Sequence, residues 1–161
     1  MKNIHNLDLS RKKIILRADL NVPITNGKIT EKSRILSIKP TIKQLRRNNN
    51  KIFIISHFGR PKGKRNDKYS LKFICPHLEK EFGIDKIFFL NNIDDKKIKQ
   101  TIDIMKPGDV CLIENIRFFP EEENNDQDFS KNLSKNFDIY VNDAFSASHR
   151  KHASVIGIPK Y

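Results

Sequence analysis

The sequence predicts an α/β fold of the doubly wound type, in which helices cover both faces of a mostly parallel sheet. Short, almost wholly apolar runs, such as residues 14–16 and residues 51–56 (KIFIIS), are typical of strands that are buried on both faces. These runs alternate along the chain with segments of helical periodicity. Such alternation gives parallel pairing with right-handed crossovers. We therefore expect a Rossmann-like three-layer domain.

Five strands are expected, and they span residues 11–20, 51–56, 86–90, 109–114 and 138–142. After the first strand, Asn26-Gly27 predicts a tight hairpin between Ile24 and Ile29, because both turn residues tolerate the positive φ angles that such a turn needs. No internal repeat and no interdomain linker is evident in the sequence. We therefore expect one domain.

Four helices are expected between the strands. In the first, Ile35, Ile38, Ile42 and Leu45 recur at three- and four-residue steps. Thr30 or Ser33 would cap its start. Pro40 would kink it, and residues 48–50 (three asparagines) would end it. The other helices are expected at residues 70–82, closed by Gly83, and at 94–105 and 129–136, with a loop over the acidic segment 120–128.

Composition restricts the class of protein. The chain has 161 residues, of which 37% are hydrophobic and 31% charged, enough for a folded core. No apolar segment is long enough to span a membrane, and residues 1–13 lack the hydrophobic region of a signal peptide. Cys75 and Cys111 are far apart, as expected for two reduced, structural thiols in a cytoplasmic protein.

The formal net charge of +12 and the pI near 9.8 suggest nucleic-acid binding as one possible function. The basic residues are scattered over expected helices, strands and loops, and no basic stripe with aromatic residues stands out. We attribute the charge to a general compositional bias toward Lys, Asn and Ile. A charge-driven RNA-binding protein is kept as an alternative, with nonspecific affinity at low salt.

Polar side chains gather where the expected strands end. Asp19 and Asn21 follow the first strand, His57 and Arg60 the second, Arg117 the fourth, and His149 and Arg150 the fifth. The carboxyl ends of parallel strands lie along one edge of the sheet, where open α/β sheets bind ligands. Arginine grips phosphate or carboxylate bidentately, whereas an acid beside an amide suits a hydroxyl group. The implied ligand is a small phosphorylated hydroxy acid.

Each of these residues alone has a simpler explanation. Asp19 and Asn21 fit a solvated turn. Arg60 and Arg117 fit surface ion pairs that contribute little to stability. His57 fits a hydrogen-bonded loop residue. The convergence of the whole set is therefore the specific signal, rather than any one member of it.

Two other motifs are rejected. His149 and His152 have a zinc-like spacing, but no Cys or acidic residue follows at ligand spacing. Residues 59–64 resemble a phosphate-binding P-loop, but the segment is one residue short and Arg65 replaces the expected Ser or Thr. Neither motif supports a metal or nucleotide site in this chain.

Four segments resemble the signature blocks of the phosphoglycerate kinase family. They are residues 17–23 (RADLNVP), 56–62 (SHFGRPK), 114–118 (ENIRF) and 140–154 (YVNDAFSASHRKHAS). The blocks occur in the family's order, and the resemblance extends from the first expected strand to the end of the chain. Agreement of four independent blocks makes the resemblance highly specific.

The resemblance implies a role for each site residue. Asp19 and Asn21 would hold the hydroxyl end of the substrate. The basic patch that holds phosphoglycerate would consist of His57, Arg60, Arg117 and Arg150. Arg34 matches the family arginine beside the transferring phosphoryl group and is the expected catalytic residue. In this glycolytic family, 1,3-bisphosphoglycerate passes a phosphoryl group to Mg-ADP, giving ATP and 3-phosphoglycerate.

The resemblance covers only part of a family member. Family proteins are more than twice as long, and their nucleotide-binding half, with a Gly-Gly-Ala-Lys motif and a catalytic lysine, matches nothing here. We expect residues 1–161 to be the N-terminal phosphoglycerate-binding domain of a monomeric enzyme. The C-terminal nucleotide-binding domain, which would bind Mg-ADP or Mg-ATP, is absent. The alternative is a truncated anion-binding module without catalysis, since transfer requires both substrates to be clamped in line.

Overall fold

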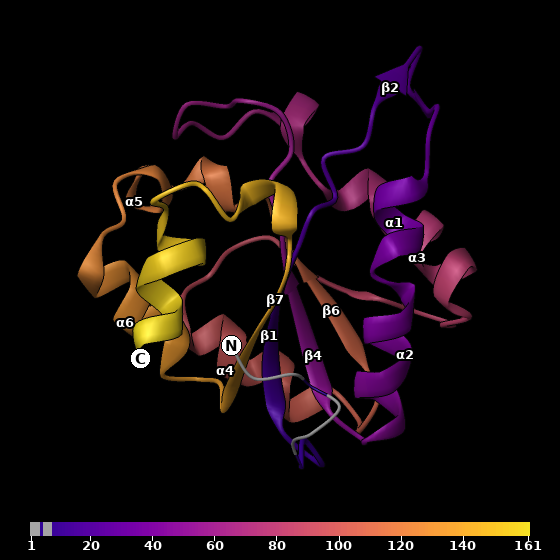
Figure 1. Ribbon diagram of the computed structural model, residues 1–161, viewed down its shortest axis with the longest axis vertical. Coiled ribbons are helices and arrows are strands. Elements are labelled where there is room, and N and C mark those ends of the chain that lie inside the picture. The colour runs from indigo at the N-terminus through magenta and orange to yellow at the C-terminus, as the bar shows by residue number, and fades with distance from the viewer. Residues whose placement is uncertain (1–3, 5–7) are drawn as a thin grey trace.

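Five parallel strands form the central sheet of the computed structural model, which describes Ile4 and residues 8–161 (Figure 1). The strands are β1 (Lys13–Ala18), β4 (Lys51–Ile55), β5 (Phe88–Leu90), β6 (Val110–Ile113) and β7 (Ile139–Asp143). Their order in the sheet is β5-β6-β4-β1-β7, and every neighbouring pair is parallel. The expected doubly wound fold is confirmed.

Helices cover both faces of this sheet. They are α1 (Ser33–Ser37), α2 (Lys39–Arg47), α3 (Cys75–Phe82), α4 (Asp95–Ile104), α5 (Pro120–Glu123) and α6 (Gln127–Ser134). Short helical turns are η2 (Asp67–Tyr69), η3 (Lys72–Ile74), η4 (Ile116–Phe118), η5 (Phe145–Ala147), η6 (Ala153–Gly157) and η7 (Ile158–Lys160). In Figure 1, α1 to α3 lie to the right of the sheet, and α5 and α6 lie to the left.

The core consists of two apolar layers, one on each face of the sheet. Side chains of β1 alternate between them, because successive residues of a strand point to opposite faces. Ile14 and Leu16 pack in the layer that contains Ile42 of α2, whereas Ile15 packs in the layer that contains Ile98 of α4. The sheet is therefore buried on both faces, as its continuous apolar runs predicted.

Proline decides where two of the expected helices begin. The kink expected at Pro40 is a break between α1 and α2 at Ile38, and Pro40 lies in the first turn of α2. Proline has no N–H to donate and is tolerated in the first turn of a helix. In the same way α3 begins only at Cys75, with Pro76 in its first turn, and residues 72–74 form a separate turn.

Two local expectations are wrong. Neither Thr30 nor Ser33 caps α1; the N-cap is Lys32, whose side chain makes no capping hydrogen bond. The acidic segment 120–128 is helical over much of its length, forming α5 and the start of α6. The carboxylate of Asp126 caps α6 by accepting a hydrogen bond from the N–H of Phe129 (2.7 Å).

The expected hairpin is present. The strands β2 (Ile24–Thr25) and β3 (Lys28–Ile29) pair antiparallel, with Ile24 opposite Ile29. Asn26 and Gly27 both have positive φ angles, 51° and 73°. The hairpin lies beyond the carboxyl end of β1, at the top of Figure 1.

Cys75 and Cys111 are both free and buried. Burial raises the pKa of the Cys75 thiol to about 11 and also raises the pKa of Cys111, so both thiols stay protonated and unreactive. The expectation of two reduced, structural thiols is confirmed.

Within the described part of the chain, no helix is long and apolar enough to cross a membrane. The expectation that residues 1–13 carry no signal peptide concerns a segment of which residues 1–3 and 5–7 lie outside the described residues.

Candidate functional site

The carboxyl ends of four adjacent strands, β6, β4, β1 and β7, bring expected site residues to one edge of the sheet. In the strand register, Arg17 of β1 lies opposite Ile55 of β4, and Ala18 lies opposite Asp143 of β7. The first residues beyond these strands therefore start at the same level. The N–H of Leu20 also donates a hydrogen bond to Ser56 Oγ (2.9 Å), which ties the segment after β1 to the segment after β4.

Asp19 is a half-buried carboxylate held by three donors. Arg34 Nη1 and Ser146 Oγ both donate to Asp19 Oδ2, and the N–H of Asn21 donates to Oδ1 (3.1 Å). Partial burial alone would raise the pKa of Asp19, but these hydrogen bonds outweigh it and lower the pKa below its ordinary value. The group is therefore an ionised carboxylate linked to the cation on α1.

Asn21 and Arg117 both bind the backbone of Gly59, one at its N–H and the other at its carbonyl. Asn21 Oδ1 accepts a hydrogen bond from the N–H of Gly59 (2.9 Å), and Arg117 Nη1 donates to the carbonyl of Gly59 (2.9 Å). Gly59 has a φ of 61°, and a Cβ there would lie 2.4 Å from the Tyr69 ring. Glycine is therefore required at the point where Asn21 and Arg117 shape the loop that carries Arg60.

His57 is a buried neutral imidazole. Its side chain is 6% exposed, and its Nδ1 lies 3.1 Å from Arg17 Nη2. Arginine can only donate, so Nδ1 is assigned as the acceptor and the ring proton as residing on Nε2. Burial, followed by the positive charges of Arg17 and Arg117, lowers the pKa of His57 to about 3. At neutral pH His57 therefore offers a hydrogen-bond donor rather than a charge.

Arg117, Arg150 and Arg60 supply positive charge at this edge. Arg117 is only 3% exposed, with Nε 3.7 Å from Glu123 Oε1, and burial followed by the charge of Arg150 lowers its pKa. Arg150 is half-buried and also lowers the pKa of His57. Arg60 is exposed and makes no hydrogen bond or ion pair with another described residue, so its guanidinium is available to a ligand.

No metal site accompanies this constellation: across residues 8–161, no three His, Cys, Asp or Glu side chains come together in a way that could hold an ion. The site combines one carboxylate, one neutral imidazole and several guanidinium groups. Such a set can bind an anionic ligand that also carries a hydroxyl group.

A family model described as phosphoglycerate kinase matches residues 4–161. The chain belongs to the phosphoglycerate kinase family. The phosphoglycerate kinase of Trichodesmium erythraeum is 45% identical to it over 157 residues, which are 96% of this chain and 38% of that protein. The phosphoglycerate kinase of Borrelia hermsii is 44% identical over 161 residues, 100% of this chain and 41% of that protein.

Solved structures of phosphoglycerate kinases share the fold. The enzyme from Pyrococcus horikoshii OT3 matches with a TM-score of 0.86 and 30% identity, over 98% of this chain and 40% of that chain. The enzyme from Coxiella burnetii matches with a TM-score of 0.84 and 34% identity, over 96% and 38%. The chain therefore spans about two fifths of the length of these phosphoglycerate kinases.

A buried polar network directly behind His57 was not predicted from the sequence. Arg17 is 2% exposed and donates through Nε to Ser154 Oγ (3.0 Å). Ser154 donates to Glu122 through both its hydroxyl (2.5 Å) and its N–H (2.8 Å). Tyr140 donates its hydroxyl to the carbonyl of Ser154 (2.5 Å). The network links β1, β7, α5 and η6 and fixes the guanidinium that orients His57.

One signal could have found part of this network. Arg17 is the only charged residue in the otherwise apolar run from residue 14 to residue 18, and a charge within a buried strand requires a partner. Nothing in the sequence distinguishes Glu122 from its acidic neighbours Glu121 and Glu123. Its complete burial depends on how α5 packs against η6.

Proposed function

We propose that this chain is the N-terminal, phosphoglycerate-binding domain of a phosphoglycerate kinase, and that it binds 3-phosphoglycerate and 1,3-bisphosphoglycerate at the carboxyl edge of its sheet. In the complete enzyme a phosphoryl group would pass between 1,3-bisphosphoglycerate and ADP, giving 3-phosphoglycerate and ATP. The single observation that carries the proposal is the convergence of guanidinium groups and the His57 imidazole beside the ionised Asp19.

The assigned roles follow from the chemistry of each group. Asp19 accepts a hydrogen bond from the substrate hydroxyl, and Asn21 supports this end of the site by holding the loop at Gly59. The substrate's negative charges are bound by His57, Arg60, Arg117 and Arg150. An exposed guanidinium such as that of Arg60 can turn to grip a phosphate bidentately. The neutral His57 donates through Nε2.

Arg34 is assigned to the transfer step. Its Nη1 is bonded to Asp19, and its side chain remains 39% exposed, so the rest of the guanidinium can reach a phosphoryl group above Asp19. In phosphoryl transfer, charge develops on the moving group, and a fixed cation beside it stabilises the transition state.

The nucleotide is assigned to a part of the family protein outside residues 1–161. Mg-ADP or Mg-ATP would be bound there, and both substrates must be clamped in line before transfer can occur. Within this proposal the chain alone binds phosphoglycerate without turning it over. The complete protein is proposed to act as a cytoplasmic monomer, with no specific nucleic-acid or membrane partner.

Isothermal titration calorimetry of the chain with 3-phosphoglycerate tests the proposal. We expect weak saturable binding. Arg60→Ala and Arg150→Ala should each weaken it by about 1–3 kcal/mol, the scale of hydrogen bonds to charged groups.

The matched control is Arg46→Ala. Arg46 lies in the last turn of α2, near the opposite edge of the sheet, so its removal subtracts the same charge without touching the site. Equal losses for all three variants would mean that net charge rather than a shaped site holds the ligand, and that outcome would refute the site assignment.

A further inference from the structure

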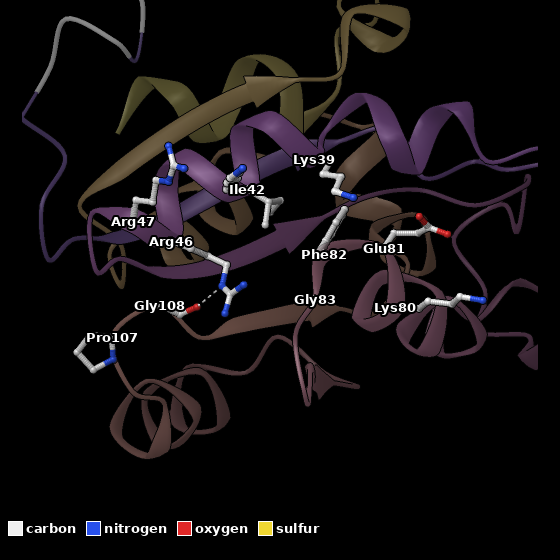
Figure 2. Close-up of a pocket in the computed structure, with 11 residues that line it drawn as sticks. Lys39, Ile42, Arg46, Arg47, Lys80, Glu81, Phe82, Gly83, Pro107 and Gly108 are labelled. Atoms are coloured by element: carbon white, nitrogen blue, oxygen red, sulfur yellow. Dashed lines mark hydrogen bonds between the residues drawn. The ribbon is translucent and has the colours of Figure 1, made fainter.

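A cleft lies between α2 and the segments that follow α3 and precede β6. Its volume is about 670 Å³, within the usual range for ligand sites. Figure 2 shows Lys39 and Arg46 extending from α2 toward the segments that carry Phe82 and Gly108. Ile42 and Phe82 supply apolar surface between them.

This cleft is separate from the candidate substrate site. Gly108 lies just before β6 and Gly83 just after α3, so the cleft opens toward the amino edge of the sheet. The cleft also includes Arg46 and Arg47 in the last turn of α2. Asp19 and Arg34 lie at the carboxyl edge, beyond β1 and on α1.

The cleft is strongly cationic. Five basic residues line it: Lys39, Lys43, Arg46, Arg47 and Lys80. None of these five lies within 4.0 Å of a carboxylate among residues 8–161. Glu81 is the one acid that lines the cleft, and its carboxylate is already bound by Lys32 Nζ (2.9 Å). The charges of Lys39 and Lys80 also help to lower the pKa of Glu81, after the hydrogen bond from Lys32, so this one acid neutralises the five cations only in part.

Lys39 and Lys43 are placed where they destabilise α2. Lys39, Lys43 and Arg47 follow one another at four-residue steps, and like charges at this spacing repel. Lys39 is also the first residue of α2, where the helix dipole disfavours a cation. Support of the helix C-terminus explains Arg46, which donates to the carbonyl of Gly108 (3.0 Å), but not Lys39 or Lys43.

The spacing of these charges suits an extended anion. From Lys39 to Arg47 the row of cations is about 12 Å long, at 1.5 Å per helical residue, and Lys80 lies across the cleft from it. No lining side chain among the described residues is an amide or a hydroxyl, so the cleft lacks the Asn or Gln side chain that pairs with adenine. The five cations along the cleft suit successive negative charges.

We propose that this cleft binds a linear polyphosphate, whose adjacent phosphates lie along α2 and receive charge-assisted hydrogen bonds from Lys39, Lys43, Arg47 and Lys80. Arg46, held by the carbonyl of Gly108, lies beside Arg47 near the end of the row. Bound phosphates neutralise the repulsion along α2, so the ligand also stabilises the helix.

The test is a titration of the ¹⁵N-labelled chain with sodium tripolyphosphate at physiological ionic strength, without Mg²⁺. We expect saturable shifts of the Gly83 and Gly108 amide signals, which report on the cleft. Excess 3-phosphoglycerate should leave these shifts unchanged, so the result does not depend on the proposed substrate site.

The key variant combines Lys39→Gln, Lys43→Gln and Arg47→Gln. It retains Arg46 and its bond to Gly108, and it removes the like-charge repulsion, so the thermal midpoint should stay the same or rise. Affinity for tripolyphosphate should fall by about tenfold or more. The matched control, Lys28→Gln with Lys96→Gln and Lys131→Gln, removes three exposed charges elsewhere and should retain the wild-type affinity.

Three outcomes would overturn the proposal. Equal loss in both triple variants would mean that bulk charge attracts the ligand. Shifts confined to segments other than α2, α3, Gly83 and Gly108 would place the ligand elsewhere. ATP binding to the cleft about tenfold more tightly than tripolyphosphate, or binding of single-stranded RNA alone, would show that a base is recognised.

Discussion

At the scale of single residues, His57 links the site to the acid stability of the fold. Its pKa is about 3 in the folded chain against an ordinary value of 6.5. As the pH falls below 6.5, His57 therefore takes up a proton in the unfolded state but stays neutral in the folded state. The contribution of His57 to stability is intact above pH 6.5 and is lost progressively between pH 6.5 and pH 3.

We expect the free energy of unfolding, measured in urea, to fall by about 2 kcal/mol between pH 7 and pH 4.5 through this residue. His57→Asn should remove most of that dependence, because the variant has no group that titrates in this window. His77→Asn, at a half-buried position on α3, is the control and should keep the wild-type slope. An unchanged slope for His57→Asn would mean that the buried imidazole is protonated in the folded chain.

The position of the candidate site residues at one edge of the sheet was predictable, but their individual contacts were not. Parallel strands place Asp19 and His57 at one edge, and that follows from the pattern of apolar runs. The use of Asn21 and Arg117 to hold Gly59 depends on a positive φ at that glycine, which no periodicity encodes. Loop conformation decides which polar group faces a ligand and which one supports another segment.

At the scale of secondary-structure elements, the strands followed from the sequence more closely than the helix starts. The expected strand at 51–56 is β4 at residues 51–55, because an apolar run bounded by polar residues leaves little choice. The start of α1 was mispredicted because the Thr30 hydroxyl donates to the carbonyl of Pro23 (3.3 Å), and the N–H of Ser33 donates to the carboxylate of Glu31. Several side chains could satisfy that donor, and only the backbone path selects one.

The helix α5 was missed because tertiary contacts, and not local pattern, stabilise it. It has only four residues, of which three are consecutive glutamates, and this pattern predicts a solvated loop. Its central Glu122 is 0% exposed and accepts both hydrogen bonds from Ser154. A helix of four residues is too short to be stable by itself, so the contacts of its buried side chain, here the bonds of Glu122 to Ser154, stabilise it.

Glu122→Gln should therefore lower the free energy of unfolding by about 2–4 kcal/mol, because it leaves Arg17 without its balancing charge and weakens the bonds to Ser154. Chemical denaturation monitored by circular dichroism measures the loss. Glu121→Gln removes the same charge from the same helix at a half-buried position and should change stability by less than about 0.5 kcal/mol. Equal effects of the two variants would show that α5 contributes only net charge.

At the scale of the whole molecule, the two edges of the sheet carry different kinds of positive charge. At the carboxyl edge, Arg17 and Arg117 are buried, and the guanidinium groups of Arg34, Arg117 and Arg17 are fixed by Asp19, Gly59 and Ser154. At the amino edge, Lys39, Lys43 and Arg47 of α2 are exposed. The first arrangement suits selective binding of one small anion, and the second suits an extended anion.

In a complete enzyme, substitution of Arg34 would best separate substrate binding from phosphoryl transfer. Its guanidinium is already bonded to Asp19, so it is oriented before substrate arrives. An interaction that strengthens mainly in the transition state lowers kcat when it is lost, with little change in ground-state affinity. We therefore expect Arg34→Ala to reduce kcat by about 100-fold, the scale for loss of a preorganised charge-stabilising group.

The measurement needs this chain joined to, or complemented by, the nucleotide-binding half of a family member, with kcat and KM for 3-phosphoglycerate determined separately. Arg47→Ala is the control, because it removes the same charge from an exposed position on α2. A rise in KM with unchanged kcat would make Arg34 a ground-state binding residue. Turnover equal to that of the wild type would remove Arg34 from the site and leave the bond to Asp19 as a structural ion pair. Loss of kcat alone would place the moving phosphoryl group beside α1.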